Sequence, residues 1–216
     1  GRYAAGRAAN IAREGKAMKL YDREQSGNCH KVRLLLSMLG LEYEKVAVDL
    51  GKGENRKPEF LRLNPRGQVP TLTDGDVTVW DSQAILVYLA RRYGSEKWLP
   101  TEALAITEVM QWLAMSENEF LFGLARARQN KKMNGPWPWD LTSALGLSGL
   151  AVINEHLGGN DWLALDRPTI ADLACYPYVA LAHQGEISLD DFPAVRAWMV
   201  RIQALPGYVG MPGIGD

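Results

Sequence analysis

The first hundred residues alternate between short apolar runs and longer stretches whose apolar residues recur every three or four positions. Short runs bounded by turn residues indicate strands, and the longer spacing indicates amphipathic helices. The predicted order is strand, helix, strand, helix, two strands and helix. The strands are expected at residues 19–21, 43–48, 70–72 and 77–80, and the helices at residues 29–40, 58–63 and 82–92.

A short hairpin stands before the last of these helices. Pro70 lies at the start of a strand, where it removes one donor from the ladder, and residues 73–76 form a turn that contains glycine. Asp81 and Ser82 then open the helix. An unpaired strand segment before the proline and the bare N–H groups at the helix start therefore lie close together. A small extended peptide that ends in a carboxylate would satisfy both groups.

The second half of the chain has a purely helical pattern. Gly, Ser and Pro cluster at residues 94–100, between two helical stretches. The sharpest signal beyond them is Thr169 followed by Asp172, a capping box in which Asp replaces the usual Glu or Gln. We expect helices at residues 101–126, 140–157, 169–183 and 192–204.

These patterns predict two domains, of different fold class. An α/β domain is expected over residues 18–94, a linker over 95–100 and an all-helical domain over 101–216. Residues 1–17 are rich in Ala and Arg and form an extension ahead of Met18. This extension has no apolar region and no serine, so an upstream start or added residues explain it better than a targeting peptide. It has the composition of an appended helix.

Composition narrows the classes of partner. The chain has 216 residues, 47% of them apolar, and a formal net charge of −1, which argues against nucleic acid or an anionic membrane as a partner. No apolar run reaches the roughly 18 residues of a membrane span. Two cysteines in a chain of this length indicate a reducing compartment, so we expect a cytoplasmic protein. Three histidines without ligand spacing predict no metal site.

Three motifs carry a resemblance to a known family. Residues 26–29 (Ser-Gly-Asn-Cys), 64–70 (Asn-Pro-Arg-Gly-Gln-Val-Pro) and 81–85 (Asp-Ser-Gln-Ala-Ile) resemble, in order and spacing, the glutathione-site motifs of cytosolic glutathione transferases. The resemblance covers roughly residues 18–208. It implies a thioredoxin-like first domain, a helical second domain, a homodimer and glutathione as a co-substrate, with no other cofactor. The region around residues 28–31 and 48–53 is also similar to the bacterial nu-type members, which reduce disulfides.

Ser26 and Asn28 are the candidates for the sulfur chemistry. A hydroxyl that donates to a thiolate contributes about 1.5–3 kcal/mol, and a helix N-terminus adds roughly 0.3–1 kcal/mol. Together these supply the roughly 2.7 kcal/mol that lowers a thiol pKa by two units. Spacing alone favours Ser26 as a helix cap, but the resemblance to serine-type members implies that it holds the thiolate. Asn28 is the second thiol donor or a loop residue, and Cys29 is expected to face the core.

The remaining groups of glutathione would be bound by the other two motifs. The resemblance implies that Val69, before a cis Pro70, pairs with the cysteinyl backbone. Ser82 with its helix N-terminus suits the γ-glutamyl carboxylate, and Asp81 suits the ammonium group. The glycyl carboxylate needs a cation, where Gln68 offers only an amide. Lys52, Arg56 and Lys57 are the basic residues that could replace it.

The electrophile is expected to bind between the domains. From helix position we place Trp112, Glu117, Phe120 and Arg126 in its pocket. The two Trp residues of the loop at 129–140 either form a small cluster under that loop or wall the pocket. We therefore expect a detoxifying glutathione transferase that acts on a small, hydrophobic electrophile. The alternatives are a glutathione-dependent disulfide or peroxide reductase and a non-catalytic glutathione-binding or adaptor protein.

Overall fold

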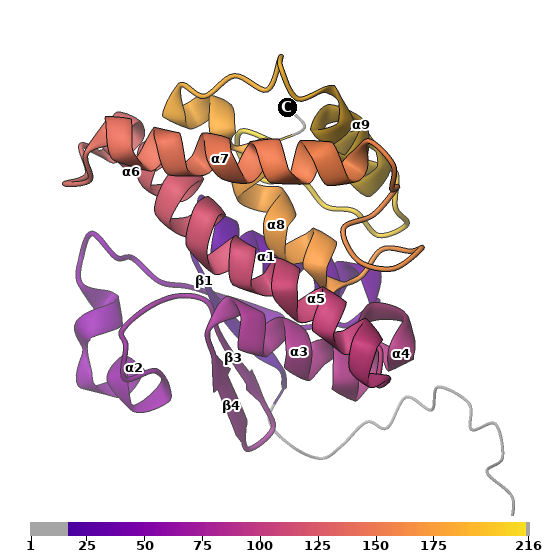
Figure 1. The fold of residues 1–216 in the computed structure, drawn as a ribbon. Coiled ribbons are helices and arrows are strands. Elements are labelled where there is room, and N and C mark those ends of the chain that lie inside the picture. Colours follow the sequence, from indigo (N-terminus) through magenta and orange to yellow (C-terminus); the bar gives the residue numbers. More distant parts are fainter. Residues whose placement is uncertain (1–16, 215–216) are drawn as a thin grey trace, which may run out of the picture.

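The computed structural model describes residues 17–214, so the expected helix in the N-terminal extension lies outside the described residues. Two domains follow one another along the chain (Figure 1). The first contains a four-stranded sheet and the second is helical, which confirms the predicted fold class. The elements of the first domain are β1 (Lys19–Asp22), α1 (Gly27–Met38), β2 (Glu44–Ala47), η1 (Glu54–Arg56), α2 (Pro58–Leu63), β3 (Thr71–Asp74), β4 (Val77–Trp80) and α3 (Ser82–Tyr93).

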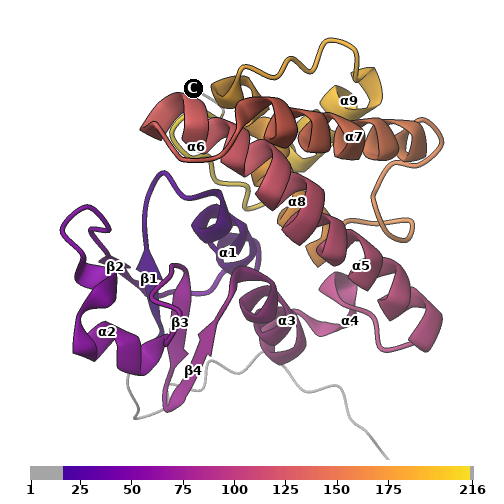
Figure 2. The same ribbon diagram turned by 60° about the vertical axis from the view of Figure 1, so that its left-hand side comes forward.

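The strand order is β2-β1-β3-β4, with β1 parallel to β2 and antiparallel to β3. Leu20 of β1 lies opposite Leu72 of β3, and both side chains are fully buried. Helices α1 and α3 lie between the sheet and the second domain, whereas α2 lies toward the other side (Figures 1 and 2). This is the thioredoxin-like arrangement that the order of elements predicted.

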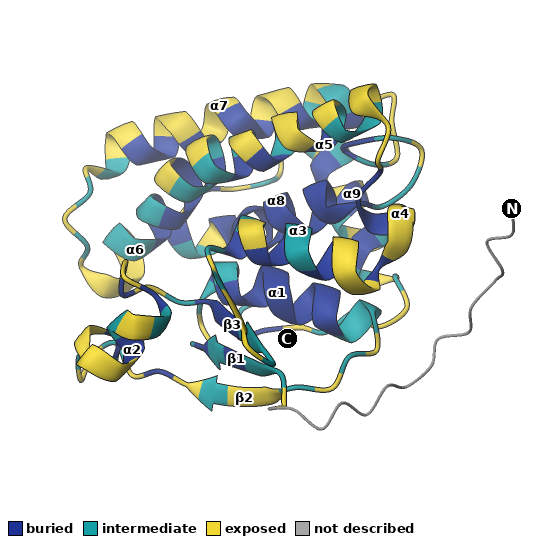
Figure 3. Ribbon diagram, turned by 90° about the horizontal axis from the view of Figure 1, so that it is seen from below, coloured by how far each residue is buried: buried dark blue, intermediate teal, exposed yellow. Residues whose placement is uncertain are grey.

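The helix α1 is more deeply buried than an amphipathic pattern predicts. The sequence predicts one apolar face, but every residue from 29 to 36 is buried, including His30, Lys31 and Arg33. The cause is that α1 packs against α3 in its own domain and against α8 in the second domain (Figure 3). Its polar side chains therefore need partners inside the protein.

The second domain begins after a short connection. The expected linker at residues 95–100 contains a one-turn helix, α4 (Ser95–Trp98). The first predicted helix continues beyond residue 126, through a π-helical stretch that the sequence did not reveal. The elements are α5 (Ala103–Met115), η2 (Ser116–Ala125, π-helical), α6 (Arg126–Met133), α7 (Trp139–Leu157), α8 (Ile170–Ala180), η3 (Ala182–Gly185) and α9 (Pro193–Gln203).

The helix α8 forms the centre of the second domain, and its predicted capping box is confirmed. The Ala171 N–H donates to Thr169 Oγ1 (3.2 Å), and the Thr169 N–H donates to Asp172 Oδ2 (2.9 Å). Asp172 Oδ1 also accepts from the Leu163 N–H (3.0 Å) and from Trp198 Nε1 (2.9 Å). One carboxylate thus joins the start of α8 to the preceding loop and to α9. Burial raises the pKa of Asp172 despite these donors.

Candidate active site

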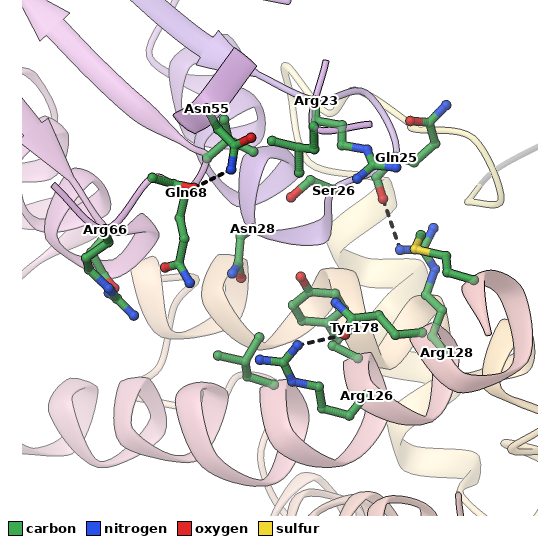
Figure 4. Close-up of a pocket in the computed structure, with 18 of the residues that line it drawn as sticks. Arg23, Gln25, Ser26, Asn28, Asn55, Arg66, Gln68, Arg126, Arg128 and Tyr178 are labelled. Carbon is green, nitrogen blue, oxygen red and sulfur yellow. Dashed lines mark hydrogen bonds and ion pairs between the residues drawn. The ribbon is translucent and has the colours of Figure 1, made fainter. Parts of the chain in front are cut away.

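A cavity of about 320 Å³ lies between the two domains, in the size range of small-molecule sites. The first domain supplies the loop before α1, the loop before β3 and the start of α3, while the second domain supplies η2, α6 and Tyr178 of α8. In Figure 4, Ser26, Asn28 and Gln68 approach the cavity from the first domain, whereas Arg126, Arg128 and Tyr178 approach it from the second.

Ser26 and Asn28 both line this cavity at the start of α1. Ser26 is the helix N-cap, and its Oγ accepts a hydrogen bond from the Cys29 N–H at 3.2 Å. Because that oxygen acts as the acceptor, the hydroxyl proton remains free to be donated to a ligand. The Oδ1 atom of Asn28 is buried and has no hydrogen-bond partner among the described residues.

Cys29 faces away from the cavity, as the sequence predicted. It is fully buried, and its Sγ accepts a hydrogen bond from the Arg23 N–H at 3.5 Å. Burial, with a smaller contribution from the nearby Asp22 carboxylate, raises the pKa of this thiol to about 12. Cys29 is therefore protonated and unreactive near neutral pH.

Val69 is the residue whose main chain is available to a peptide. The Val69–Pro70 bond is cis, and Val69 and Gln68 line the cavity, whereas Pro70 is buried behind them. The N–H and C=O groups of Val69 make no hydrogen bond within the described residues. The loop is fixed on both sides, because Asn55 Nδ2 donates to the Gly67 carbonyl (2.7 Å) and Asn64 Nδ2 donates to the Gln68 carbonyl (2.8 Å).

Asp81 stands at the point where α3 begins. Its φ of 78° is unusual for a residue other than glycine, and such a backbone occurs often at functional sites. Its Oδ1 accepts from the Gln83 N–H (3.0 Å), and its Oδ2 forms an ion pair with Arg66 (3.1 Å). Asp81 lines the cavity, while the adjacent Ser82 is 3% exposed and lies one residue inside the helix, outside the lining.

The four pocket residues chosen by helix position separate into two pairs. Glu117 and Arg126 line the cavity, but Trp112 and Phe120 do not. Phe120 has no exposed surface, and Trp112 stacks on His156 with ring centroids 4.8 Å apart. Glu117, Leu121 and Arg126 lie in or just after the π-helical stretch, at intervals of four to five residues, and all three line the cavity.

Glu117 is held by groups from the first domain. Its Oε1 accepts from Gln83 Nε2 at 2.8 Å and lies 3.4 Å from Lys31 Nζ. Lys31 is fully buried, and its ammonium group also donates to Ser116 Oγ at 3.0 Å. Burial lowers the pKa of Lys31, and the Glu117 carboxylate partly offsets that effect.

Sequence reasoning missed Tyr178, Arg128, Arg23 and Gln25, which also line the cavity. Tyr178 packs directly on Gly27, where an added Cβ would lie 2.6 Å from the tyrosine Cε1. Burial raises the pKa of its phenol to about 12. Arg128 donates to the Gln25 carbonyl at 3.0 Å. These contacts join residues more than 100 positions apart, so no local sequence pattern predicts them.

Of the three basic residues considered for the glycyl carboxylate, Arg56 lines the cavity. Lys52 forms an exposed ion pair with Asp49 at 3.1 Å, and Lys57 borders a separate hollow beside β2 and α2. Arg66 lines the cavity as well, although it is already paired with Asp81. Among the described residues no group of three acidic, His or Cys side chains could hold a metal ion. No described helix is long and apolar enough to cross a bilayer.

Known proteins share this architecture along most of the chain. Residues 16–91 match the model of the glutathione S-transferase N-terminal domain, and residues 148–206 match that of the C-terminal domain. Disulfide-bond oxidoreductase YfcG of Escherichia coli (strain K12) is 32% identical over 83% of this chain and 87% of its own length. Glutathione S-transferase 3 of Zea mays is 34% identical, over 88% of this chain and 91% of its own.

A solved structure gives the same result in three dimensions. The glutathione S-transferase from Xanthobacter autotrophicus Py2 superimposes with a TM-score of 0.85 at 34% identity, covering 91% of this chain and 98% of that one. Sequence, domain order and fold therefore agree, and the chain belongs to the cytosolic glutathione transferase family.

Proposed function

We propose that this chain binds glutathione in the interdomain cavity and conjugates it, through its sulfur, to a small electrophile. Family membership gives the chain glutathione-dependent chemistry. One observation carries the proposal. The unpaired main chain of Val69, the start of α3 at Asp81 and the start of α1 at Ser26 border the same cavity.

Each part of glutathione has a partner in this arrangement. The cysteinyl backbone pairs with the N–H and C=O of Val69, and the γ-glutamyl end lies at Asp81 and the N-terminus of α3 with Ser82. The glycyl carboxylate is bound by Arg56, beside Gln68. This pose brings the sulfur to the start of α1, next to Ser26 and Asn28.

The chemical step requires a thiolate near neutral pH. The Ser26 hydroxyl donates to the sulfur, and the N-terminus of α1 adds a favourable partial charge. The thiolate then attacks an electrophilic carbon, so a carbon–sulfur bond forms while the bond to the leaving group breaks, and the leaving group departs with the electron pair. Tyr178, which stays protonated, is a second hydroxyl donor at the cavity.

Disulfide reduction is the second candidate, and Asn28 is the observation that favours it. The buried, unpartnered Asn28 amide oxygen lies in an amide group that can also donate two hydrogen bonds to a sulfur atom. The relative from Escherichia coli is named a disulfide-bond oxidoreductase. No described cysteine lines the cavity, so glutathione itself is the nucleophile. Two glutathiones would convert one disulfide into two thiols and glutathione disulfide.

Substitutions at Ser26 separate its two roles. Ser26→Gly removes the hydroxyl but keeps a residue that is favourable at the N-cap, whereas Ser26→Ala removes the hydroxyl and the favourable N-cap residue together. Each change is expected to raise the pKa of bound glutathione by about one to two units and to lower kcat/KM with 1-chloro-2,4-dinitrobenzene about 10- to 100-fold at pH 7. Cys29→Ala, the matched control, should leave kcat/KM within a few-fold. Normal activity in Ser26→Gly contradicts the thiolate role.

The same variants decide between the two reactions. If Asn28→Ala abolishes turnover of a dialkyl disulfide while both Ser26 variants retain it, disulfide reduction is the principal activity. Binding is tested separately by calorimetry, where Ser82→Ala should weaken glutathione by roughly 1–3 kcal/mol. Glutathione binding without turnover of either substrate would indicate the non-catalytic role.

We further propose that two copies of the chain associate. Large apolar side chains are exposed on α3 and α5, namely Tyr93 (39%), Leu104 (67%) and Met110 (50%), and the edge residue Trp80 is 38% exposed. Burying them between copies removes apolar surface from water. Light scattering at micromolar concentration should give a dimer, and a monomer would contradict this proposal.

A further inference from the structure

The cavity has an excess of positive charge. Both acids that line it are already paired, Asp81 with Arg66 at 3.1 Å and Glu117 with Lys31 at 3.4 Å. Four other arginines at the cavity have no carboxylate partner among the residues that the structure describes, namely Arg23, Arg56, Arg126 and Arg128. Glutathione would neutralise part of this charge, at the first-domain side.

Arg128 is already engaged in hydrogen bonds within the protein. It is 7% exposed, and it donates to Gln184 Oε1 (2.7 Å) and to the Gln25 carbonyl (3.0 Å). These bonds fix the loop that carries Ser26 against α6. Arg56 is on the first domain, where the proposed function uses it for the glycyl carboxylate. Arg126 therefore remains as the unpaired cation of the helical-domain side.

Arg126 is positioned by aromatic rings. Its guanidinium carbon lies 4.3 Å from the centroid of the Trp137 ring and 5.6 Å from that of Phe122. Nη1 donates to Gln129 Oε1 at 2.7 Å, whereas Nε is buried without a partner. In Figure 4 this side chain reaches from the second domain toward Tyr178 and Asn28. These cation–π contacts hold the guanidinium without using its N–H donors.

Apolar side chains lie beside Arg126 in the cavity. Leu121, Phe122, Ala125 and Met133, from the same helical segment, line the cavity beside it. Burial lowers the pKa of Arg126 because the charge is poorly solvated, and an anion in the cavity would restore the lost solvation. A cation held beside apolar side chains matches a ligand with an apolar body and a planar anionic end.

From this geometry we infer that the second substrate is an electrophile that carries a carboxylate, and that Arg126 binds this carboxylate. The inference rests on the proposed function and makes its substrate more specific, since the sequence predicted a merely hydrophobic electrophile. Arg126 is here a specificity-determining residue. Trp137 supports it from behind, which gives this loop tryptophan a role at the edge of the site.

A matched pair of substrates tests the inference. In 4-chloro-3,5-dinitrobenzoate and its methyl ester, the glutathione sulfur displaces the same chloride from the same ring, but only the acid carries a charge. Because the ester group activates the ring more than a carboxylate does, each kcat/KM is divided by the rate constant of the uncatalysed reaction with glutathione, and we expect wild type to have the higher corrected value with the acid. Arg126→Gln should reduce the acid-to-ester ratio of kcat/KM about 10- to 100-fold, the usual effect of a lost hydrogen bond to a charged group. Arg126→Lys should give an intermediate ratio.

Arg196→Gln is the control for a lost surface charge, because Arg196 is exposed and its Nη1 lies as far as 4.0 Å from Asp190 Oδ1. It should leave the ratio unchanged. An unchanged ratio in Arg126→Gln, or a preference of wild type for the ester in the corrected values, overturns the inference. If neither compound is turned over, the proposed transferase activity is wrong, and calorimetry with unreactive 3,5-dinitrobenzoate and its methyl ester still decides whether Arg126 binds the anion.

Discussion

Lys31 and Glu117 form a charge pair that spans the two domains, and their substitution tests how the domains are held together. The two atoms, Lys31 Nζ and Glu117 Oε1, are 3.4 Å apart, with side chains 0% and 32% exposed. At an effective dielectric constant of about 20 this attraction amounts to roughly 5 kcal/mol, and to about half of that where water reaches the carboxylate. Glu117→Gln is therefore expected to cost about 2–4 kcal/mol of unfolding free energy, because it leaves a buried ammonium without a countercharge.

Lys31→Met should behave differently, since it removes the buried charge and keeps most of the side-chain volume. Glu117 would still accept a hydrogen bond from Gln83 Nε2 at 2.8 Å. We expect a change within about 1 kcal/mol, in either direction, as for other buried ion pairs replaced by apolar groups. In the Lys31→Met background, Glu117→Gln should then cost less than about 1 kcal/mol.

Wild type, both single variants and the double variant together form a double-mutant cycle. The stability of each is measured by urea unfolding at pH 7, followed by tryptophan fluorescence. The pH dependence gives an independent check. Because burial lowers the pKa of Lys31, the unfolded chain binds more protons in the alkaline window below its ordinary pKa of 10.5, and the stability contributed by Lys31 rises with pH there. The stability of wild type relative to Lys31→Met should therefore rise across that window. An equal cost of Glu117→Gln in both backgrounds would refute the charge-pair reasoning.

Three further predictions concern buried positions. Gly123→Ala should lower Tm, because its Cβ would lie 2.5 Å from the main-chain nitrogen of Gly146, and the cost of overpacking, about 1–3 kcal/mol, outweighs a gain in helix propensity of about 1 kcal/mol. Gly159→Ala is the control, since its Cβ would have nothing within 4 Å, and equal Tm values for the two variants would contradict this prediction. Burial lowers the pKa of His30 to about 3, so the free energy of unfolding should fall as pH drops from about 6.5 to 3. Urea titrations at pH 7 and 4.5 should show a smaller fall for His30→Leu than for wild type. An equal fall in both proteins would exclude His30 as the cause. Cys29 should resist iodoacetamide at pH 8 until urea is added, and rapid labelling of the folded protein would show that its thiol is accessible.

Much of the first domain could be predicted because its signals are local. The helix at Pro58–Leu63 begins at a proline and was predicted with its observed bounds. The hairpin follows from a proline, a glycine turn and an Asp cap, and the capping box of α8 needs only Thr169 and Asp172. In each case the residues that determine the element are a few positions apart.

The helical side of the site could not be predicted in the same way. It includes a π-helical stretch, which no apolar pattern in residues 116–125 predicts. The burial of Lys31 could not be predicted either, because a lysine on a predicted helix is expected on the solvated face. The packing of α8 against α1 buries it, and its partners Ser116 and Glu117 lie 85 and 86 residues further along. Tertiary contacts decide the environment of such residues.

The buried pair also shapes the charge of the cavity. Glu117 could in principle neutralise Arg126, since both line the same space. Instead its Oε1 is occupied by Lys31 and Gln83, both from the first domain, while Arg126 is held by Trp137 and Gln129 of the second. The acid and the cation are thus held by different partners, and the positive charge of Arg126 has no carboxylate partner among the described residues. If Arg126 binds a substrate carboxylate as inferred above, the domain interface contributes to substrate choice through Lys31, a residue that does not line the cavity.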